Sequence, residues 1–294
     1  MKRIKSCHGD MRKKLWQFTA VAVCLSGCGL SAPQRGELAL PGVGLAIFET
    51  RANATDIVRV LVFFPSEPDG RPKAGPFPAM VYVQGGFVPS SRYAWQAEAL
   101  AAQGYVVAMP DHLLDLAFFS IENGEVARQL LVRPPPGSLL EGLVDSKRVA
   151  VAGHSLGGVV AFKLALLGGF RAIVVEASFS DSADDSKIGS LGMPSLFLAG
   201  ALDCQAKLTQ VEMGWAKMPS PTALVVLPGM THYGFTDTDA DDAKRCPPQA
   251  PIDASHARIV AAMTGFLEAA FDPNGASVGE VALRAVDGVE VTTR

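Results

Sequence analysis

Residues 149–158 constrain the fold of this chain more than any other segment. They read Val-Ala-Val-Ala-Gly-His-Ser-Leu-Gly-Gly and are followed by an apolar stretch with helical character up to Leu167. The apolar run predicts a buried strand, and a serine between a strand and a helix must lie on a very sharp turn. The flanking glycines permit the close backbone approach that such a turn requires. The pattern Gly-x-Ser-x-Gly in this context predicts a nucleophilic Ser155, and the alternative is a glycine-rich turn with an idle serine.

Apolar runs and segments of helical periodicity alternate along the rest of the 294-residue chain. Strands are expected at 57–64, 79–84, 105–109, 148–152, 172–176, 195–199 and 223–227. Helices are expected at 91–103, 125–132, 156–167, 209–218 and 255–271. The sequence therefore predicts an α/β fold, with a mostly parallel central sheet of about eight strands flanked by helices on both faces. Residues 111–145 are too few for a large cap domain, and the alternation about Asp287-Gly288 predicts a C-terminal hairpin.

A serine hydroxyl is a weak nucleophile unless a neighbouring base accepts its proton. His232 is the expected base, because it lies in a loop directly after the strand 223–227 and follows Ser155 in the chain. Asp203 follows the strand 195–199 and lies between these two residues, so the chain order Ser, Asp, His predicts a catalytic triad. Glu176, at the end of the strand before, is the alternative acid.

The oxyanion that develops during acyl transfer needs backbone N–H donors that are already in place. One donor is expected from Leu156, the residue after the nucleophile. The other is expected from the loop after the strand 79–84, where Phe87 is the candidate and Gly86 gives the turn its freedom. An ordinary turn at Gly85-Gly86 is the alternative.

These segments together resemble the α/β-hydrolase superfamily, and most of all the group that holds dienelactone hydrolases, chlorophyllases, platelet-activating-factor acetylhydrolases and cutinases. The matching segments are Arg148–Gly158, Gly200–Asp203 and Gly229–Phe235, and the likeness covers about residues 50–272. The resemblance implies hydrolysis of a carboxylic ester through an acyl-enzyme, without a metal or cofactor. Dienelactone hydrolases carry a cysteine nucleophile, which disfavours their activity here. Many members have His-Gly where this chain has Gln84-Gly85, so the second oxyanion donor stays open.

Without a large cap, the site is expected to be open and shallow. Its expected lining is Gly86, Phe87, Tyr233, Phe118 and Phe119, with core packing as the alternative for the last two. Such a site suits a small-molecule or lipid-like ester. A non-catalytic lipoprotein, or a peptidase or thioesterase on the same fold, remains an alternative function because specificity lies in loops.

The first 27 residues have the pattern of a secretory signal. Six basic residues within Met1–Lys14 precede the apolar run 15–25, and Ser26-Gly27-Cys28 follows it. Leu25–Cys28 resembles a bacterial lipobox, which implies that Cys28 is lipidated and anchors the mature chain to a membrane of the cell envelope, at the outer membrane or the periplasmic face. The chain starts at either Met1 or Met11.

The remaining chain is acidic and contains one further pair of cysteines. Residues 1–27 hold six of the 26 basic and one of the 29 acidic residues, which leaves 20 and 28 and a net charge of −8. That charge does not suggest a nucleic-acid partner. Cys204 and Cys246 predict a disulfide in an oxidising compartment, with two free thiols as the alternative. The expected organisation is a signal peptide at 1–27, a tether at 28–45, a hydrolase domain at 46–272 and an extension at 273–294, in a monomer.

Overall fold

A computed structural model describes residues 40–51, 57–111, 121–242, 244–272 and 286–294, and in it nine strands form one sheet. The strands are β1 (Val43–Arg51), β2 (Ile57–Pro65), β3 (Phe77–Val83), β4 (Val106–Pro110), β5 (Val144–His154), β6 (Ala172–Glu176), β7 (Ser195–Gly200), β8 (Thr222–Leu227) and β9 (Glu290–Thr293). Their order across the sheet is β1-β2-β4-β3-β5-β6-β7-β8-β9. The strands from β3 to β8 are parallel, whereas the pairs β1–β2, β2–β4 and β8–β9 are antiparallel.

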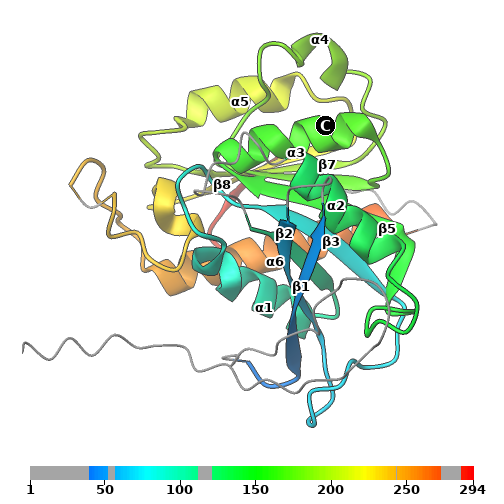
Figure 1. Ribbon diagram of the computed structural model, residues 1–294. Coiled ribbons are helices and arrows are strands. Elements are labelled where there is room, and N and C mark those ends of the chain that lie inside the picture. The colour runs from blue at the N-terminus through cyan, green and yellow to red at the C-terminus, as the bar shows by residue number, and fades with distance from the viewer. Residues whose placement is uncertain (1–39, 52–56, 112–120, 243, 273–285) are drawn as a thin grey trace, which may run out of the picture.

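Helices cover both faces of this sheet (Figure 1). They are α1 (Ala94–Ala102), α2 (Ile121–Val132), α3 (Leu156–Leu167), α4 (Asp185–Ile188), α5 (Leu208–Ala216) and α6 (Ile252–Phe271), with short 3-10 helices η1 (Ser90–Tyr93) and η4 (His232–Phe235). Helices α1 and α6 pack together on one face, while α3 and α5 lie on the other and α2 packs beside α3 (Figure 1). The predicted three-layer α/β fold with a mostly parallel sheet is therefore confirmed.

Each expected strand and helix has a counterpart, but β1 and α4 had not been expected. Strand β1 begins at Val43, inside the range that the sequence assigned to a tether. It pairs with β2 along its whole length, from Val43 opposite Pro65 to Arg51 opposite Ile57. Val43–Phe48 is buried without a break, so β1 has no polar alternation that would mark a half-exposed strand.

The C-terminal strand joins the main sheet. Strand β9 pairs antiparallel with β8, with Val291 opposite Val225, and so forms one edge of the nine-stranded sheet. The first arm of the expected hairpin lies outside the described residues, as do the expected signal segment and Cys28. In the part of the chain that the structure describes, no helix has the length and apolar character to cross a membrane.

The parallel strands are fully enclosed and end at one edge of the sheet. All residues of β4, β6 and β7 are buried, because helices cover both faces. In open α/β sheets, the loops beyond the carboxyl ends of parallel strands form the ligand site. Ser155 follows β5, Asp203 follows β7 and His232 follows β8, so the fold places all three loops at that edge.

Candidate active site

Ser155 occupies the sharp turn between β5 and α3. Its φ of +53° lies in the left-handed region, which residues other than glycine rarely adopt. Two hydrogen bonds hold this strained backbone: the Ser155 N–H donates to the Glu176 carbonyl oxygen at 2.9 Å, and the Ser178 hydroxyl donates to the Ser155 carbonyl oxygen at 2.6 Å. Such a turn projects the serine side chain away from the sheet edge, where a substrate can reach it.

The glycines around Ser155 are required by close packing. A Cβ atom on Gly153 would lie 2.2 Å from the Gly157 carbonyl oxygen, and one on Gly157 would lie 2.2 Å from the Val83 carbonyl oxygen. A Cβ atom on Gly158 would lie 2.4 Å from the Ser178 Cβ. The start of α3 therefore presses against the ends of β3 and β5 and against the segment after β6, at distances that only glycine permits.

Ser155, His232 and Asp203 are hydrogen-bonded in series. The His232 Nε2 lies 2.9 Å from the Ser155 Oγ, and the His232 Nδ1 lies 2.7 Å from the Asp203 Oδ2. The Asp203 Oδ1 accepts the N–H groups of Gln205 and Ala206, both at 2.8 Å. Because the carboxylate accepts a proton-bearing Nδ1, Nε2 is left unprotonated and can accept the Ser155 hydroxyl proton. The structure thus brings together the three residues that the sequence singled out.

The histidine loop has two supports. The Tyr233 N–H donates to the buried Asp242 Oδ2 at 2.7 Å, so this carboxylate anchors the 3-10 helix that carries His232. A disulfide joins Cys204 to Cys246, as the sequence predicted, and so ties the residue after Asp203 to the segment after Asp242. Sequence reasoning assigned no role to Asp242, because one acid in a stretch rich in aspartate carries no signal of its own.

Glu176, the alternative acid, does not contact His232 in this arrangement. Its carboxylate accepts the Tyr82 hydroxyl at 2.6 Å and the Gln96 amide Nε2, on the side of the sheet covered by α1 and α6. Its side chain is fully buried, and this burial raises the pKa of Glu176 to about 7, against the two hydrogen bonds that favour the ionised form. Although Glu176 is the last residue of β6, its side chain points into the core and not toward the loops beyond the carboxyl ends of the strands.

The expected oxyanion donors lie beside the elbow. Gly85–Val88 forms a turn, closed by the Val88 N–H and the Gly85 carbonyl oxygen at 3.4 Å. Phe87, in the third position of that turn, has a φ of +61°, a position that usually requires glycine. A Cβ atom on Gly86 would lie 2.9 Å from the Leu156 Cδ2, so the turn packs on the first residue of α3. The Leu156 N–H begins α3 and has no acceptor within the helix.

A family model described as alpha/beta hydrolase family matches residues 79–244, more than half of the chain. The chain belongs to the alpha/beta hydrolase family. The matched range contains Ser155, Asp203 and His232, and membership supports a hydrolase-type function. No curated protein matches the hydrolase significantly.

Two aromatic side chains at the rim of the hydrolase site differ in their surroundings: Phe87 is exposed, whereas the Tyr233 ring contacts His232 and Arg92. Phe87 is 77% exposed. The Tyr233 ring meets His232 edge-on at 5.7 Å between centroids, and the Arg92 guanidinium lies 5.8 Å from the Tyr233 ring centroid. Arg92 also donates to Asp237 at 2.8 Å and to Asp241 at 2.6 Å, which fixes the segment after η4. Phe118 and Phe119 lie outside the described residues.

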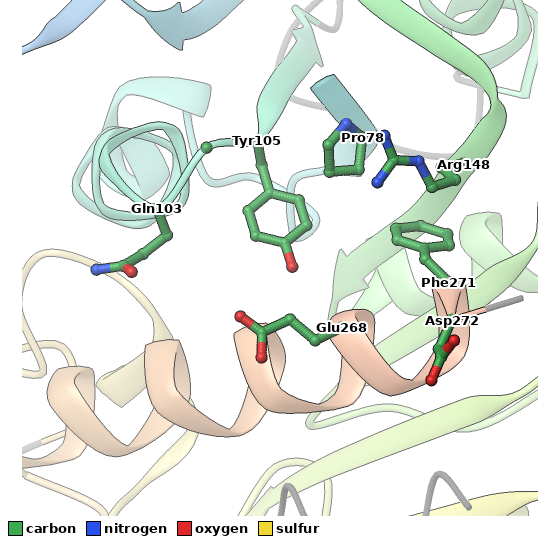
Figure 2. Close-up of a pocket in the computed structure, with 8 residues that line it drawn as sticks. Pro78, Gln103, Tyr105, Arg148, Glu268, Phe271 and Asp272 are labelled. Atoms are coloured by element: carbon green, nitrogen blue, oxygen red, sulfur yellow. The ribbon is translucent and has the colours of Figure 1, made fainter. Parts of the chain in front are cut away.

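A cavity of about 380 Å³ lies near the amino ends of β3 and β4, whereas Ser155 lies beyond the carboxyl end of β5 (Figure 2). Its lining consists of Pro78, Gln103, Gly104, Tyr105, Arg148, Glu268, Phe271 and Asp272. Figure 2 shows the Tyr105 hydroxyl pointing toward Glu268 of α6. Pro78 lies at the start of β3 and Tyr105 directly before β4, whereas Ser155 follows the end of β5. This cavity is therefore not part of the Ser155 site.

Proposed function

We propose that this hydrolase is a serine carboxylic ester hydrolase that acts through an acyl-enzyme on Ser155. The observation that carries the proposal is the series Asp203–His232–Ser155, with 2.7 Å and 2.9 Å between the hydrogen-bonded atoms. A serine becomes a nucleophile when a base lies within hydrogen-bond reach and a third group orients that base. The strained backbone of Ser155 adds to this, since such strain persists where function requires it.

In the acylation step, the Ser155 Oγ attacks the ester carbonyl carbon and its proton passes to the His232 Nε2. The tetrahedral intermediate collapses when His232 returns that proton to the departing alkoxide, which leaves as the alcohol. Water then attacks the acyl-enzyme and gives a proton to the His232 Nε2. His232 passes that proton to the Ser155 Oγ as the carboxylic acid leaves, which restores the free serine and the neutral imidazole. Asp203 holds the imidazole in the required tautomer and stabilises the imidazolium that forms.

The negative charge on the carbonyl oxygen needs fixed donors. The Leu156 N–H at the start of α3 supplies one donor together with the positive end of the helix dipole. We assign the second donor to the Phe87 N–H, in the turn that packs on Leu156.

The proposed substrate is a small-molecule or lipid-like ester. The exposed Phe87 ring offers apolar surface directly at the mouth of the site, where an acyl chain or an aromatic ring of the substrate can lie. The resemblance to the chlorophyllase, acetylhydrolase and cutinase group agrees with such a substrate. We propose that the enzyme is active as a monomer, because one chain supplies all three residues of the series.

We also propose that the enzyme works in a bacterial cell envelope, anchored through lipid on Cys28. The support is the basic segment, the apolar run and the small residues before Cys28. The disulfide between Cys204 and Cys246 agrees with an oxidising compartment.

A fluorophosphonate probe tests the chemistry, because it reacts with activated serines. We expect the wild-type chain to be labelled and to hydrolyse short or long acyl esters, and we expect Ser155→Ala and His232→Ala to lose both properties. A wild-type chain that neither labels nor cleaves any ester would overturn the enzyme proposal. Labelling that persists in Ser155→Ala would show that the nucleophile lies elsewhere.

A further inference from the structure

A second histidine is buried directly behind the proposed site. His154 is the last residue of β5, immediately before Ser155, and its side chain is 1% exposed. Its ring centroid lies 4.6 Å from that of His232 and 5.2 Å from that of Phe235. Because its backbone precedes the sharp turn, its side chain enters the protein where the Ser155 side chain leaves it. His154 therefore does not belong to the series of three residues and takes no part in the proton transfers of the proposed reaction.

The hydrogen bonds of His154 form a chain with a single direction. The His154 Nε2 lies 3.1 Å from the His232 carbonyl oxygen, which has no proton to give, so Nε2 carries the proton and donates. The His154 Nδ1 must then accept, and it lies 2.8 Å from the Tyr93 hydroxyl. The Tyr93 oxygen in turn accepts the Gly85 N–H at 3.1 Å. Every donor in this chain meets an acceptor.

The charge state of His154 agrees with that direction. Burial holds the pKa of His154 well below its ordinary value, and the neighbouring His232 lowers it further. The imidazole is therefore neutral, with one proton for one acceptor. A neutral ring also does not repel the imidazolium that forms on His232 during acyl transfer.

This chain of hydrogen bonds joins three segments that are far apart in the sequence. Gly85 begins the turn that carries Phe87, His154 belongs to the elbow, and His232 begins η4. The hydrogen bond between the Gly85 N–H and the Tyr93 hydroxyl needs glycine at position 85. A Cβ atom there would lie 2.7 Å from the Tyr93 hydroxyl oxygen and 2.9 Å from the His154 Nδ1. The proposed oxyanion turn and the proposed base are thus held to each other through the core.

We propose that Tyr93 and His154 are positioning residues that hold the Gly85–Val88 turn and the His232 backbone at a fixed separation on either side of Ser155. The inference rests on the proposed function, because it concerns the same reaction. Both the oxyanion donor and the base act in the transition state, and a displacement of about 1 Å costs about 100-fold in rate. Breaking this series of hydrogen bonds is therefore expected to lower kcat, with little change in KM.

Tyr93→Phe is the test, and Tyr82→Phe is its matched control. Both rings are fully buried, their centroids are 5.3 Å apart, and each substitution removes one hydrogen-bonded hydroxyl. The Tyr82 hydroxyl donates to Glu176, whereas the Gly85 N–H and the His154 Nδ1 both bond to the Tyr93 hydroxyl. Fluorophosphonate titration gives the fraction of competent sites, so kcat is expressed per titrated site. A fold that is only destabilised lowers the titrated fraction and leaves this value unchanged.

We expect kcat per titrated site to fall about 10- to 100-fold in Tyr93→Phe, with KM within about threefold of wild type. Tyr82→Phe is expected to stay within about threefold in both constants. His154→Phe is expected to lose at least as much as Tyr93→Phe, and His154→Gln to recover part of that loss because its amide can donate to the His232 carbonyl oxygen. The double variant Tyr93→Phe/His154→Phe is expected to lose no more than His154→Phe alone, because both substitutions break one chain.

If kcat per titrated site is the same in Tyr93→Phe as in Tyr82→Phe, the positioning role is refuted. The proposed function still stands in that case, provided that the wild-type protein is active. A change confined to KM would overturn the positioning role as well. If Tyr93→Phe yields no titratable protein, the comparison of His154→Gln with His154→Phe decides, and equal constants there refute the inference. A wild-type chain that neither labels nor hydrolyses esters removes the proposed function and this inference together.

Discussion

Replacing Glu176 with glutamine is expected to stabilise the protein at alkaline pH and to leave hydrolysis intact. Glu176 is 0% exposed, and its pKa is raised from 4.5 to about 7, chiefly by burial. Hydrogen bonds from Tyr82 and Gln96 favour the ionised form but do not offset that burial. Glutamine has the shape of the protonated side chain and never carries the charge.

The sign follows from proton binding in the two states. Between pH 4.5 and about pH 7, the folded chain keeps the Glu176 proton and the unfolded chain has lost it. The free energy of unfolding therefore falls as pH rises through this window, by about 1.4 kcal/mol per pH unit. The contribution is fully present below pH 4.5 and absent above about pH 7. The whole penalty at pH 8 is about 3 kcal/mol, and Glu176→Gln removes it.

Denaturant unfolding of both proteins at pH 5 and pH 8, followed by circular dichroism, measures this difference. Glu176→Gln is expected to be within about 1 kcal/mol of wild type at pH 5 and about 2 to 3 kcal/mol more stable at pH 8. Other titrating groups cancel, because they are common to both proteins. A stability difference that is the same at both pH values would refute the buried-charge reasoning.

The same variant separates the two candidate acids. Glu176→Gln is expected to keep ester hydrolysis within about threefold, whereas Asp203→Asn is expected to lower kcat about 10⁴-fold because His232 takes the wrong tautomer. A loss of that size in Glu176→Gln would make Glu176 the catalytic acid.

Three further predictions concern the supports of the site. Replacing Cys204 and Cys246 together with serine is expected to lower the free energy of unfolding by about 2–4 kcal/mol, because the disulfide closes a segment with a sequence separation of 42; unchanged denaturation midpoints would contradict this. Gly157→Ala is expected to cost at least about 2 kcal/mol, since the new Cβ would lie 2.2 Å from a backbone oxygen; in Gly189→Ala, its control, the Cβ meets no heavy atom within 4 Å, and equal thermal midpoints would refute the packing argument. Cys28→Ala is expected to abolish incorporation of labelled palmitate and to release the protein from the membrane fraction, and retention of the label would exclude Cys28 as the lipid site.

Local patterns determined the elbow and the sheet. A strand, a serine between glycines and a helix follow one another in Val149–Leu167, so the turn at Ser155 was readable without any long-range contact. Asp203 and His232 were readable through position, because each directly follows a buried apolar strand and parallel strands end at one edge. The pairing of β9 with β8 could not be predicted, because edge pairing depends on which neighbour the finished sheet offers. Strand β1 differs, because Val43–Phe48 is an unbroken apolar run of the kind that marks a buried strand, although the tether predicted at 28–45 overlaps its start.

Only the tertiary structure showed where the two candidate acids lie and gave His154 its partners. Glu176 and Asp203 both end or follow a strand, and only the direction of each side chain places one in the core beside Tyr82 and the other against His232. His154 stood in the motif from the start, but its bonds to Tyr93 and to the His232 carbonyl oxygen span 61 and 78 residues. The physical reason is one of range: a turn is specified by adjacent residues, whereas a buried hydrogen-bond chain exists only after packing brings distant donors and acceptors together.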